Sequence, residues 1–157
     1  MRVGYQVGQV VLRDTIDHQQ QWRNHLDQFR ASRDAGFDIY CWAHHYLIDP
    51  FQHFQPWPVL ARLAGEPGDM KLATSVLLLP LLNPVEVAEQ VATLDQISGG
   101  RFILGVGLGY RPEECEAFGT RMSQRGVRIS EAMRLMRRLW TEDEVTHNGK
   151  YFKVTGA

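Results

Sequence analysis

The chain has 157 residues, 44% of them hydrophobic and 22% charged, so it can bury one ordinary core and is not a disordered tail. Its formal net charge of −1 provides no basic face, and we expect no nucleic-acid partner. The most apolar run, residues 76–82, is too short to span a bilayer, and the N-terminus lacks a signal-peptide core. We therefore expect a soluble cytoplasmic protein without a membrane partner.

The first half of the chain alternates between strand-like and helix-like segments. Trp22, Leu26 and Phe29 recur at helical spacing and are followed by Gly36, which predicts a helix that ends there. The apolar and aromatic run after this glycine is typical of a buried strand. The predicted strands are Val3–Val7, Phe37–Trp42 and Met70–Leu79, and the predicted helices are Gln19–Ala35 and Pro56–Ala64.

The clearest helix start lies at Asn83-Pro84. Asparagine can cap a helix, and proline suits the first turn because it has no N–H group to leave unpaired. A broad apolar face runs from Val85 to Ile97, which predicts a well-buried helix, and Gly99-Gly100 ends it.

The last third of the chain predicts one more strand, one more helix and a hairpin. The strand is Phe102–Val106, and a polar loop over 112–126 follows it, with a short helix at 113–118. A helix over Ile129–Trp140 is expected to turn four side chains inward, namely Met133, Met136, Leu139 and Trp140. Asn148-Gly149 between two short β-like runs indicates a hairpin over Val145–Val154.

Four strand–helix units in succession predict an α/β fold with a parallel sheet. This pattern alone does not distinguish an open sheet from a closed barrel. A complete (β/α)8 barrel needs eight such units and about 250 residues.

Three glycines, Gly105, Gly107 and Gly109, follow the fourth predicted strand. Such a turn can bring backbone N–H groups close to a phosphate or a flat ring, or it can simply allow tight packing. It is not the dinucleotide-binding pattern, because Tyr110 stands where that pattern needs a glycine.

Two adjacent histidines, His44 and His45, end the second long strand. Imidazole can donate or accept a proton near neutral pH. Side chains alternate along a strand, so at most one ring is expected to face a site at the strand ends. We expect no metal site, because no carboxylate or third histidine stands at ligand spacing and His53 lies on a separate loop.

The third candidate is Thr74-Ser75-Val76 in the third long strand, where small and hydroxyl-bearing residues interrupt an aliphatic run. They leave room for a bulky ligand, although ordinary core packing is the simpler explanation. No Ser/His/Asp or Cys/His nucleophilic set is recognisable in the sequence.

Together these motifs resemble the luciferase-like monooxygenase family in order and spacing over nearly the whole chain. The most specific part joins Ile97-Ser-Gly-Gly-Arg-Phe102 to Gly105-Val-Gly-Leu-Gly-Tyr110. The other matching segments are Ala35–Asp38, His45–Leu47, Leu79-Pro80, Asn83-Pro84, Ala88–Asp95, Glu116–Gly119, Arg125, Glu131, Leu139-Trp140 and Gly149–Phe152.

The resemblance implies the first half of a (β/α)8 TIM barrel that holds reduced flavin mononucleotide (FMN) or a deazaflavin in its mouth. The implied activity is a flavin-dependent monooxygenase or oxidoreductase that uses dioxygen on a small organic substrate. One alternative is deazaflavin-dependent hydride transfer. The other is a catalytically incomplete half-barrel fragment.

The resemblance also implies roles for individual residues. His45 matches the active-site histidine, and a rival register gives that role to His44. The bond between Ser75 and Val76 matches a cis peptide that lies under the flavin ring. The remaining implied contacts are Asn83, Gly107 and Tyr110 in the flavin pocket and Arg125 near the phosphate, while Leu108 replaces a phosphate-binding arginine.

Complete members of the family are about twice as long, in agreement with the length that a barrel needs. We therefore expect this chain to be truncated after its fourth unit. A half-barrel has two open edge strands and an uncovered apolar interior, so we also expect it to form a homo-oligomer.

Overall fold

The computed structural model describes residues 1–7, 11–12 and 17–157. The chain folds into two compact units, each described by itself below. The first unit comprises Met1–Leu77 and Leu94–Gly105, and the second comprises Leu78–Thr93 and Val106–Ala157.

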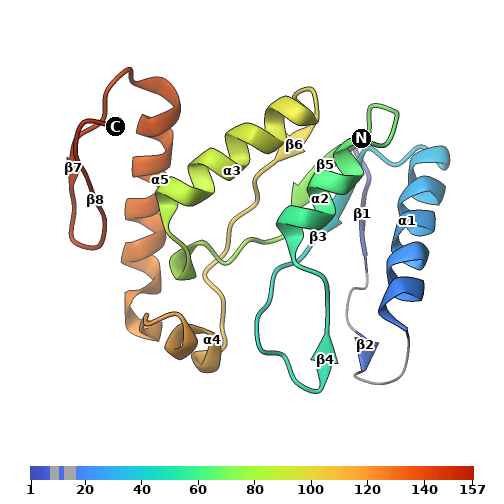
Figure 1. The fold of residues 1–157 in the computed structure, drawn as a ribbon, viewed down its shortest axis with the longest axis horizontal. Coiled ribbons are helices and arrows are strands. Elements are labelled where there is room, and N and C mark those ends of the chain that lie inside the picture. The colour runs from blue at the N-terminus through green and yellow to red at the C-terminus, as the bar shows by residue number, and fades with distance from the viewer. Residues whose placement is uncertain (8–10, 13–16) are drawn as a thin grey trace. The chain divides into compact units, whose positions relative to one another are not determined.

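A four-stranded parallel sheet organises the first unit (Figure 1). Its strand order is β1 (Gly4–Gln6), β3 (Ile39–Trp42), β5 (Lys71–Thr74) and β6 (Phe102–Ile103). Gln6 pairs with Cys41, and Cys41 pairs with Ala73, so the strands end close to one another. The α/β class and the parallel pairing predicted from the sequence are confirmed.

The core of the first unit lies on one face of this sheet. Tyr40, Trp42 and Leu72 are fully buried, and they pack with side chains from helices α1 (His18–Asp34) and α2 (Pro56–Ala64). The helix partners include Phe29, Leu60 and Leu63. Burial of large aromatic and aliphatic side chains is the main force that holds the helices on the sheet.

Helix boundaries in this unit agree closely with the sequence. α2 spans the predicted residues, and α1 begins one residue before the prediction. Asp17 caps α1, because its side chain accepts hydrogen bonds from the backbone N–H groups of Gln19 and Gln20. A two-stranded antiparallel pair, β2 (Val11–Leu12) with β4 (Phe51–Gln52), was not predicted, since two-residue strands carry no periodicity.

Thr74, the last residue of β5, joins this strand to the segment that follows β6. The Thr74 hydroxyl donates to the carbonyl oxygen of Gly105 at 2.8 Å and accepts from its N–H at 3.0 Å. A Cβ atom at position 105 would overlap the carbonyl oxygen of Thr74. Of the three glycines after the fourth strand, this one is therefore required by close backbone packing.

The second unit contains helix α3 (Pro84–Ile97), of which the residues up to Thr93 belong to this unit, together with α4 (Pro112–Ala117) and α5 (Arg125–Thr141). It also contains the short 3₁₀ helices η1 (Leu79–Leu81) and η2 (Met122–Gln124). Arg128 on α5 donates to the carbonyl oxygen of Pro80 at 2.8 Å. The Trp140 indole donates to that of Ala88 at 3.1 Å. These bonds tie α5 to η1 and α3, and the predicted capping by Asn83 is confirmed, since its Oδ1 accepts from Val85 N at 2.9 Å.

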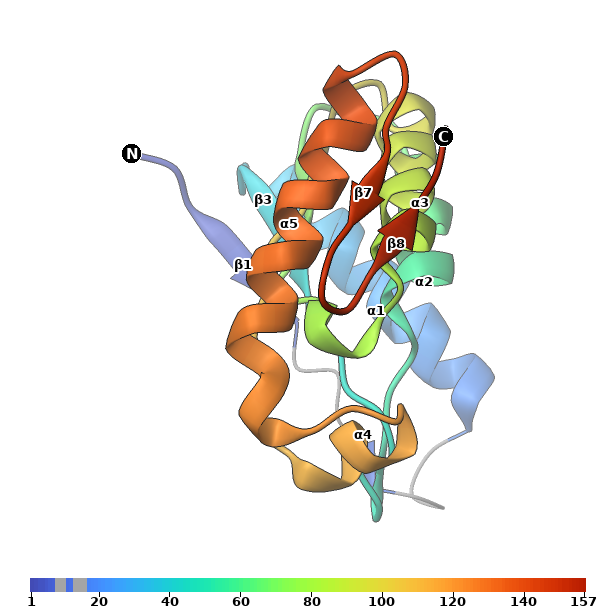
Figure 2. The ribbon, with the colours of Figure 1, turned by 90° about the vertical axis from the view of Figure 1, so that its left-hand side faces the viewer.

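A hairpin of β7 (His147–Asn148) and β8 (Lys153–Val154) lies beside α5 (Figure 2). The buried Glu131 carboxylate on α5 accepts hydrogen bonds from the N–H groups of Tyr151 and Phe152. Burial raises the pKa of Glu131, but these bonds and the nearby His147 outweigh burial, so its pKa is lowered overall.

Several predicted boundaries are wrong. The strand predicted over Met70–Leu79 ends at Thr74, because the chain turns at Ser75 and then forms η1. Helix α5 begins at Arg125 rather than at Ile129. The hairpin turn is formed by residues 149–152, with Asn148 inside β7, because Glu131 binds the loop.

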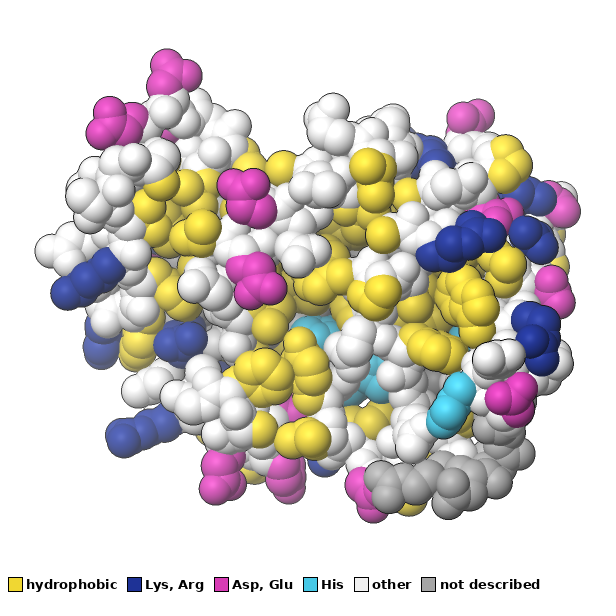
Figure 3. Space-filling model, in the orientation of Figure 1, with side chains coloured by type: hydrophobic (Ala, Val, Ile, Leu, Met, Phe, Trp, Pro, Cys, Tyr) yellow, Lys and Arg dark blue, Asp and Glu magenta, His cyan; other side chains and the backbone are white. Residues whose placement is uncertain are grey.

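Two side chains predicted to point inward from α5 are exposed instead. Met133 is 51% and Trp140 is 44% exposed, whereas Met136 is buried. Hydrophobic side chains (yellow) also lie among polar ones on the face shown in Figure 3. Exposed apolar residues are ordinary on protein surfaces, so we assign no function to these side chains. Within the described ranges, no helix is both long and apolar enough to cross a membrane.

We expect Gly105→Ala to lower the free energy of unfolding by about 1–3 kcal/mol, because the new methyl group overlaps the backbone at Thr74. Urea denaturation would measure this change. Gly126→Ala is the matched control, since nothing lies within 4 Å of a Cβ at that helical position. Equal stability of the two variants would contradict the prediction.

Candidate functional site

The carboxyl ends of the parallel strands place polar and small side chains together in the first unit. Gln6 ends β1, His44 and His45 follow β3, and Ser75 follows β5. In β/α barrels the active site lies at this end of the strands, because the loops that follow the strands meet there.

The two histidines continue the side-chain alternation of β3. Tyr40, Trp42 and His44 are buried, whereas Cys41 and His45 are only partly buried. His44 therefore follows the side of the strand that packs against the helices, and His45 follows the opposite side. This pattern agrees with the expectation that only one ring faces a site.

His44 is 2% exposed, and its ring packs edge-to-face against Tyr46 with the centroids 4.4 Å apart. Burial lowers the pKa of His44 to about 4, with smaller contributions from the charges of His53 and His45, while a hydrogen bond with Gln55 opposes the shift. His44 is therefore neutral at pH 7 and shielded from solvent. Of the two histidines, His45 is the more accessible, and its catalytic role stays a prediction.

The peptide bond between Ser75 and Val76 is cis, as the resemblance implied. The Gln6 amide donates to the Ser75 carbonyl oxygen at 3.1 Å, and the Ser75 hydroxyl donates to Gln6 Oε1 at 3.3 Å. The Val76 side chain is 40% exposed. Gln6, Ser75 and Val76 thus form a small surface with one apolar side chain and several polar groups.

Three residues of this region, Gln6, His53 and Gln55, were not predicted as site residues from the sequence. Gln6 was overlooked, although a polar residue at the last position of a parallel strand is itself a site signal. His53 was set aside as a loop residue, and Gln55 was not considered. Both contact the main chain of His45, through hydrogen bonds that span eight and ten residues and leave no mark in the sequence.

Four predicted cofactor contacts, Asn83, Gly107, Tyr110 and Arg125, belong to the second unit. Tyr110 is 70% exposed. Arg125 donates from Nε to the Met122 carbonyl oxygen at 2.9 Å and from Nη1 to that of Gly109. Within this unit Arg125 therefore holds the end of the glycine-containing turn. The cofactor roles of the four residues stay predictions.

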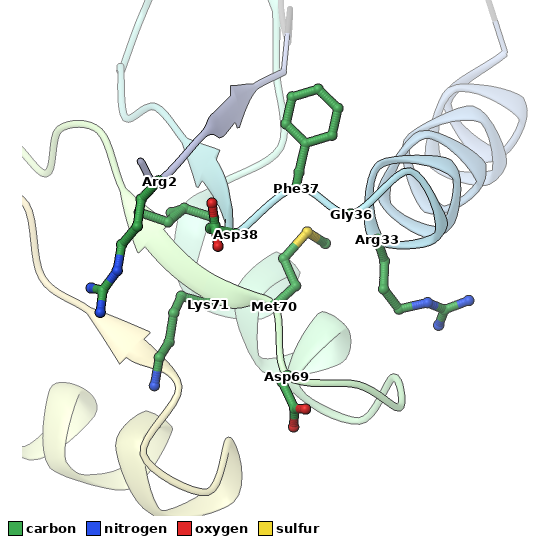
Figure 4. A pocket seen from close by; sticks show the side chains of 9 residues that line it. Arg2, Arg33, Gly36, Phe37, Asp38, Asp69, Met70 and Lys71 are labelled. Atoms are coloured by element: carbon green, nitrogen blue, oxygen red, sulfur yellow. The ribbon is translucent and has the colours of Figure 1, made fainter.

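A cavity of about 350 Å³ lies at the opposite, amino ends of the strands (Figure 4). It is lined mainly by charged side chains, Arg2, Arg33, Asp38, Asp69 and Lys71. Asp38 accepts from the N–H of Val3 at 2.6 Å and Lys71 donates to Gly100 O at 3.0 Å, so both hold neighbouring backbone. We assign no catalytic role here, because this end of β/α barrels contributes stability.

Among residues 1–7, 11–12 and 17–157, no three His, Cys, Asp or Glu side chains are grouped so that they could hold a metal ion.

Residues 1–157 match the sequence profile of the family described as luciferase-like monooxygenase. The chain belongs to this family. The resemblance seen in the sequence motifs is thereby confirmed, and family members include both flavin-dependent and F420-dependent oxidoreductases.

The chain is similar to F420-dependent enzymes and to a monooxygenase. An F420-dependent glucose-6-phosphate dehydrogenase of Intrasporangium calvum is 38% identical over 152 residues, which cover 86% of this chain and 43% of that protein. The monooxygenase RslO1 of Streptomyces bottropensis superposes with a TM-score of 0.90 at 26% identity, over 99% of this chain and 48% of RslO1. An F420-dependent secondary alcohol dehydrogenase gives 0.83 at 26% identity, over 99% and 47%.

The chain thus spans less than half the length of each of these relatives. Together with the parallel sheet, these superpositions confirm the predicted fold class, the first half of a (β/α)8 barrel.

We expect the stability of the protein to fall as the pH drops from about 6.5 to about 4, because unfolding releases His44 to take up a proton. The lowered pKa corresponds to ~3 kcal/mol of stability that is fully present above pH 6.5 and lost below pH 4. Urea denaturation at several pH values would measure the slope.

His44→Leu should flatten this slope, whatever it does to stability at neutral pH. His18→Leu, which replaces an exposed histidine, should leave the slope unchanged. An equally steep slope in His44→Leu would show that other groups cause the pH dependence.

Proposed function

We propose that this chain supplies part of the active site of a flavin-dependent monooxygenase that uses reduced FMN and dioxygen to oxidise a small organic molecule. The observation that carries the proposal is the grouping of Gln6, His45, Ser75 and Val76 at the carboxyl ends of adjacent parallel strands. Family membership and the superposition on the monooxygenase RslO1 support it.

The strand ends fit a flat tricyclic ring. Such a ring has two apolar faces and an edge of hydrogen-bonding atoms, and cofactor sites pair apolar surface with a few polar groups. Val76 offers an exposed apolar side chain, while the Gln6 amide and Ser75 hydroxyl lie directly beside it. We therefore assign Ser75 and Val76 to the ring face and Gln6 to its polar edge.

In this proposal His45 holds or delivers the proton that the oxidation requires, since imidazole exchanges protons near neutral pH. Reduced flavin, when bound, supplies the electrons with which dioxygen is activated. His44 is buried and stays neutral, so it does not take part in this proton transfer. The polypeptide thus positions the ring and substrate and controls one proton.

A second candidate function is F420-dependent hydride transfer. The F420-dependent relative at 38% identity and the F420-dependent alcohol dehydrogenase at 26% identity favour it. Val76, Ser75 and Gln6 suit either tricyclic ring. Separate titrations of the protein with FMN and with F420, followed by cofactor fluorescence, would discriminate between the two, and binding of neither would contradict both proposals.

We expect Val76→Glu to weaken binding of the preferred cofactor at least tenfold, because a carboxylate would have to be desolvated against the ring face. The dissociation constant from the fluorescence titration measures this effect. Val3→Glu is the matched control, since Val3 is similarly exposed but precedes β1 at the other end of the sheet. Equal affinity in the two variants would remove Val76 from the site.

A further inference from the structure

His53 and Gln55, in the segment that follows β4, contact the backbone nitrogen and carbonyl oxygen of His45. Nε2 of His53 lies 3.1 Å from the backbone nitrogen of His45 and 2.8 Å from its carbonyl oxygen. Nε2 of Gln55 donates to the same carbonyl oxygen at 3.0 Å. The backbone of a residue fixes where its side chain starts, so these contacts determine where the His45 ring can lie.

We propose that His53 and Gln55 are positioning residues that fix His45 for proton transfer. This inference rests on the function proposed above for His45. Both residues act through the main chain of His45 and lie in the same half-buried loop. A loop histidine without such support would sample several backbone conformations, and small misplacements of a catalytic group cost much of its rate.

The chemistry of the His53 ring suits this role. Its Nδ1 lies 3.0 Å from the carbonyl oxygen of Phe54, and because a carbonyl only accepts, Nδ1 carries a hydrogen. When Nε2 has no hydrogen, it accepts from the N–H of His45. When Nε2 is protonated, it donates to the His45 carbonyl oxygen. The ring can therefore hold the same main chain in either protonation state.

Gln55 connects the two histidines of the pair. Besides its bond to the His45 carbonyl oxygen, its side chain is hydrogen-bonded to the buried His44 ring. The rings of His45 and His53 also meet edge-to-face, with centroids 6.4 Å apart and planes at 81°. The short segment over residues 53–55 thus holds the backbone after β3 at His45, the proposed proton-transfer residue.

Hydrogen exchange at the His45 backbone amide tests the contact directly. In His53→Phe we expect exchange roughly fivefold faster, because a hydrogen bond of about 1 kcal/mol is lost. His53→Gln should restore slow exchange, since its amide can also accept from that N–H. His18→Phe is the control, because His18 lines the same recess of about 300 Å³ as His53 and has no bond to His45. Unchanged exchange in His53→Phe would overturn the proposal.

A double-mutant cycle tests whether the contact acts through His45. With FMN bound and reduced, we expect His53→Phe and Gln55→Leu each to slow reoxidation by dioxygen several-fold, and His53→Gln to recover most of the rate. In a His45→Ala background the same changes should have no further effect on the rate, because the imidazole that they position is absent although the main-chain contacts remain. An equal effect in both backgrounds would show that they act by another route and would overturn the proposal.

The two tests separate this inference from the proposed function. If the protein binds no FMN, the proposed function fails, while the exchange experiment still decides whether His53 holds the His45 backbone. If His53→Phe does not fold, Gln55→Leu with native His53 provides the same cycle at the carbonyl oxygen.

Discussion

The alternation of side chains along β3 is the constraint on which the rest of this region depends. Tyr40 and Trp42 must face the helices, because together with Phe29 they form the aromatic centre of the core. Because Tyr40 and Trp42 face the helices, the pleat of the strand places Cys41 on the opposite face. The same alternation of side chains continues through His44 and His45. The difference between a buried neutral His44 and a more accessible His45 follows from core packing two residues earlier.

Local patterns predicted the elements well where an element is long. The helix from Pro84 to Ile97 agrees with its predicted signals, an asparagine cap, a proline in the first turn and paired glycines beyond its end. The β/α order and the parallel sheet were predicted from the alternation of strand-like and helix-like segments along the chain. Strand lengths did not, because the apolar run after Met70 continues into a turn and a 3₁₀ helix that bury the same kinds of side chain.

The site was predicted only in part, and for a physical reason. The candidate role of His45, which stays a prediction, and the cis bond between Ser75 and Val76 both came from short motifs and their spacing. Gln6, by contrast, meets Ser75 across 69 residues, and such a contact exists only after the strands have paired. Gln55 acts through backbone atoms, which every residue possesses, so its role could not be read from residue types.

The buried carboxylate of Glu131 has a consequence for chain integrity. Its partners are main-chain N–H groups at positions 151 and 152, which any residue except proline supplies, so side-chain changes there are tolerated better than a break in the backbone. A protease that cut the loop over residues 149–152 would release this segment and leave the Glu131 carboxylate on α5 without its two backbone partners.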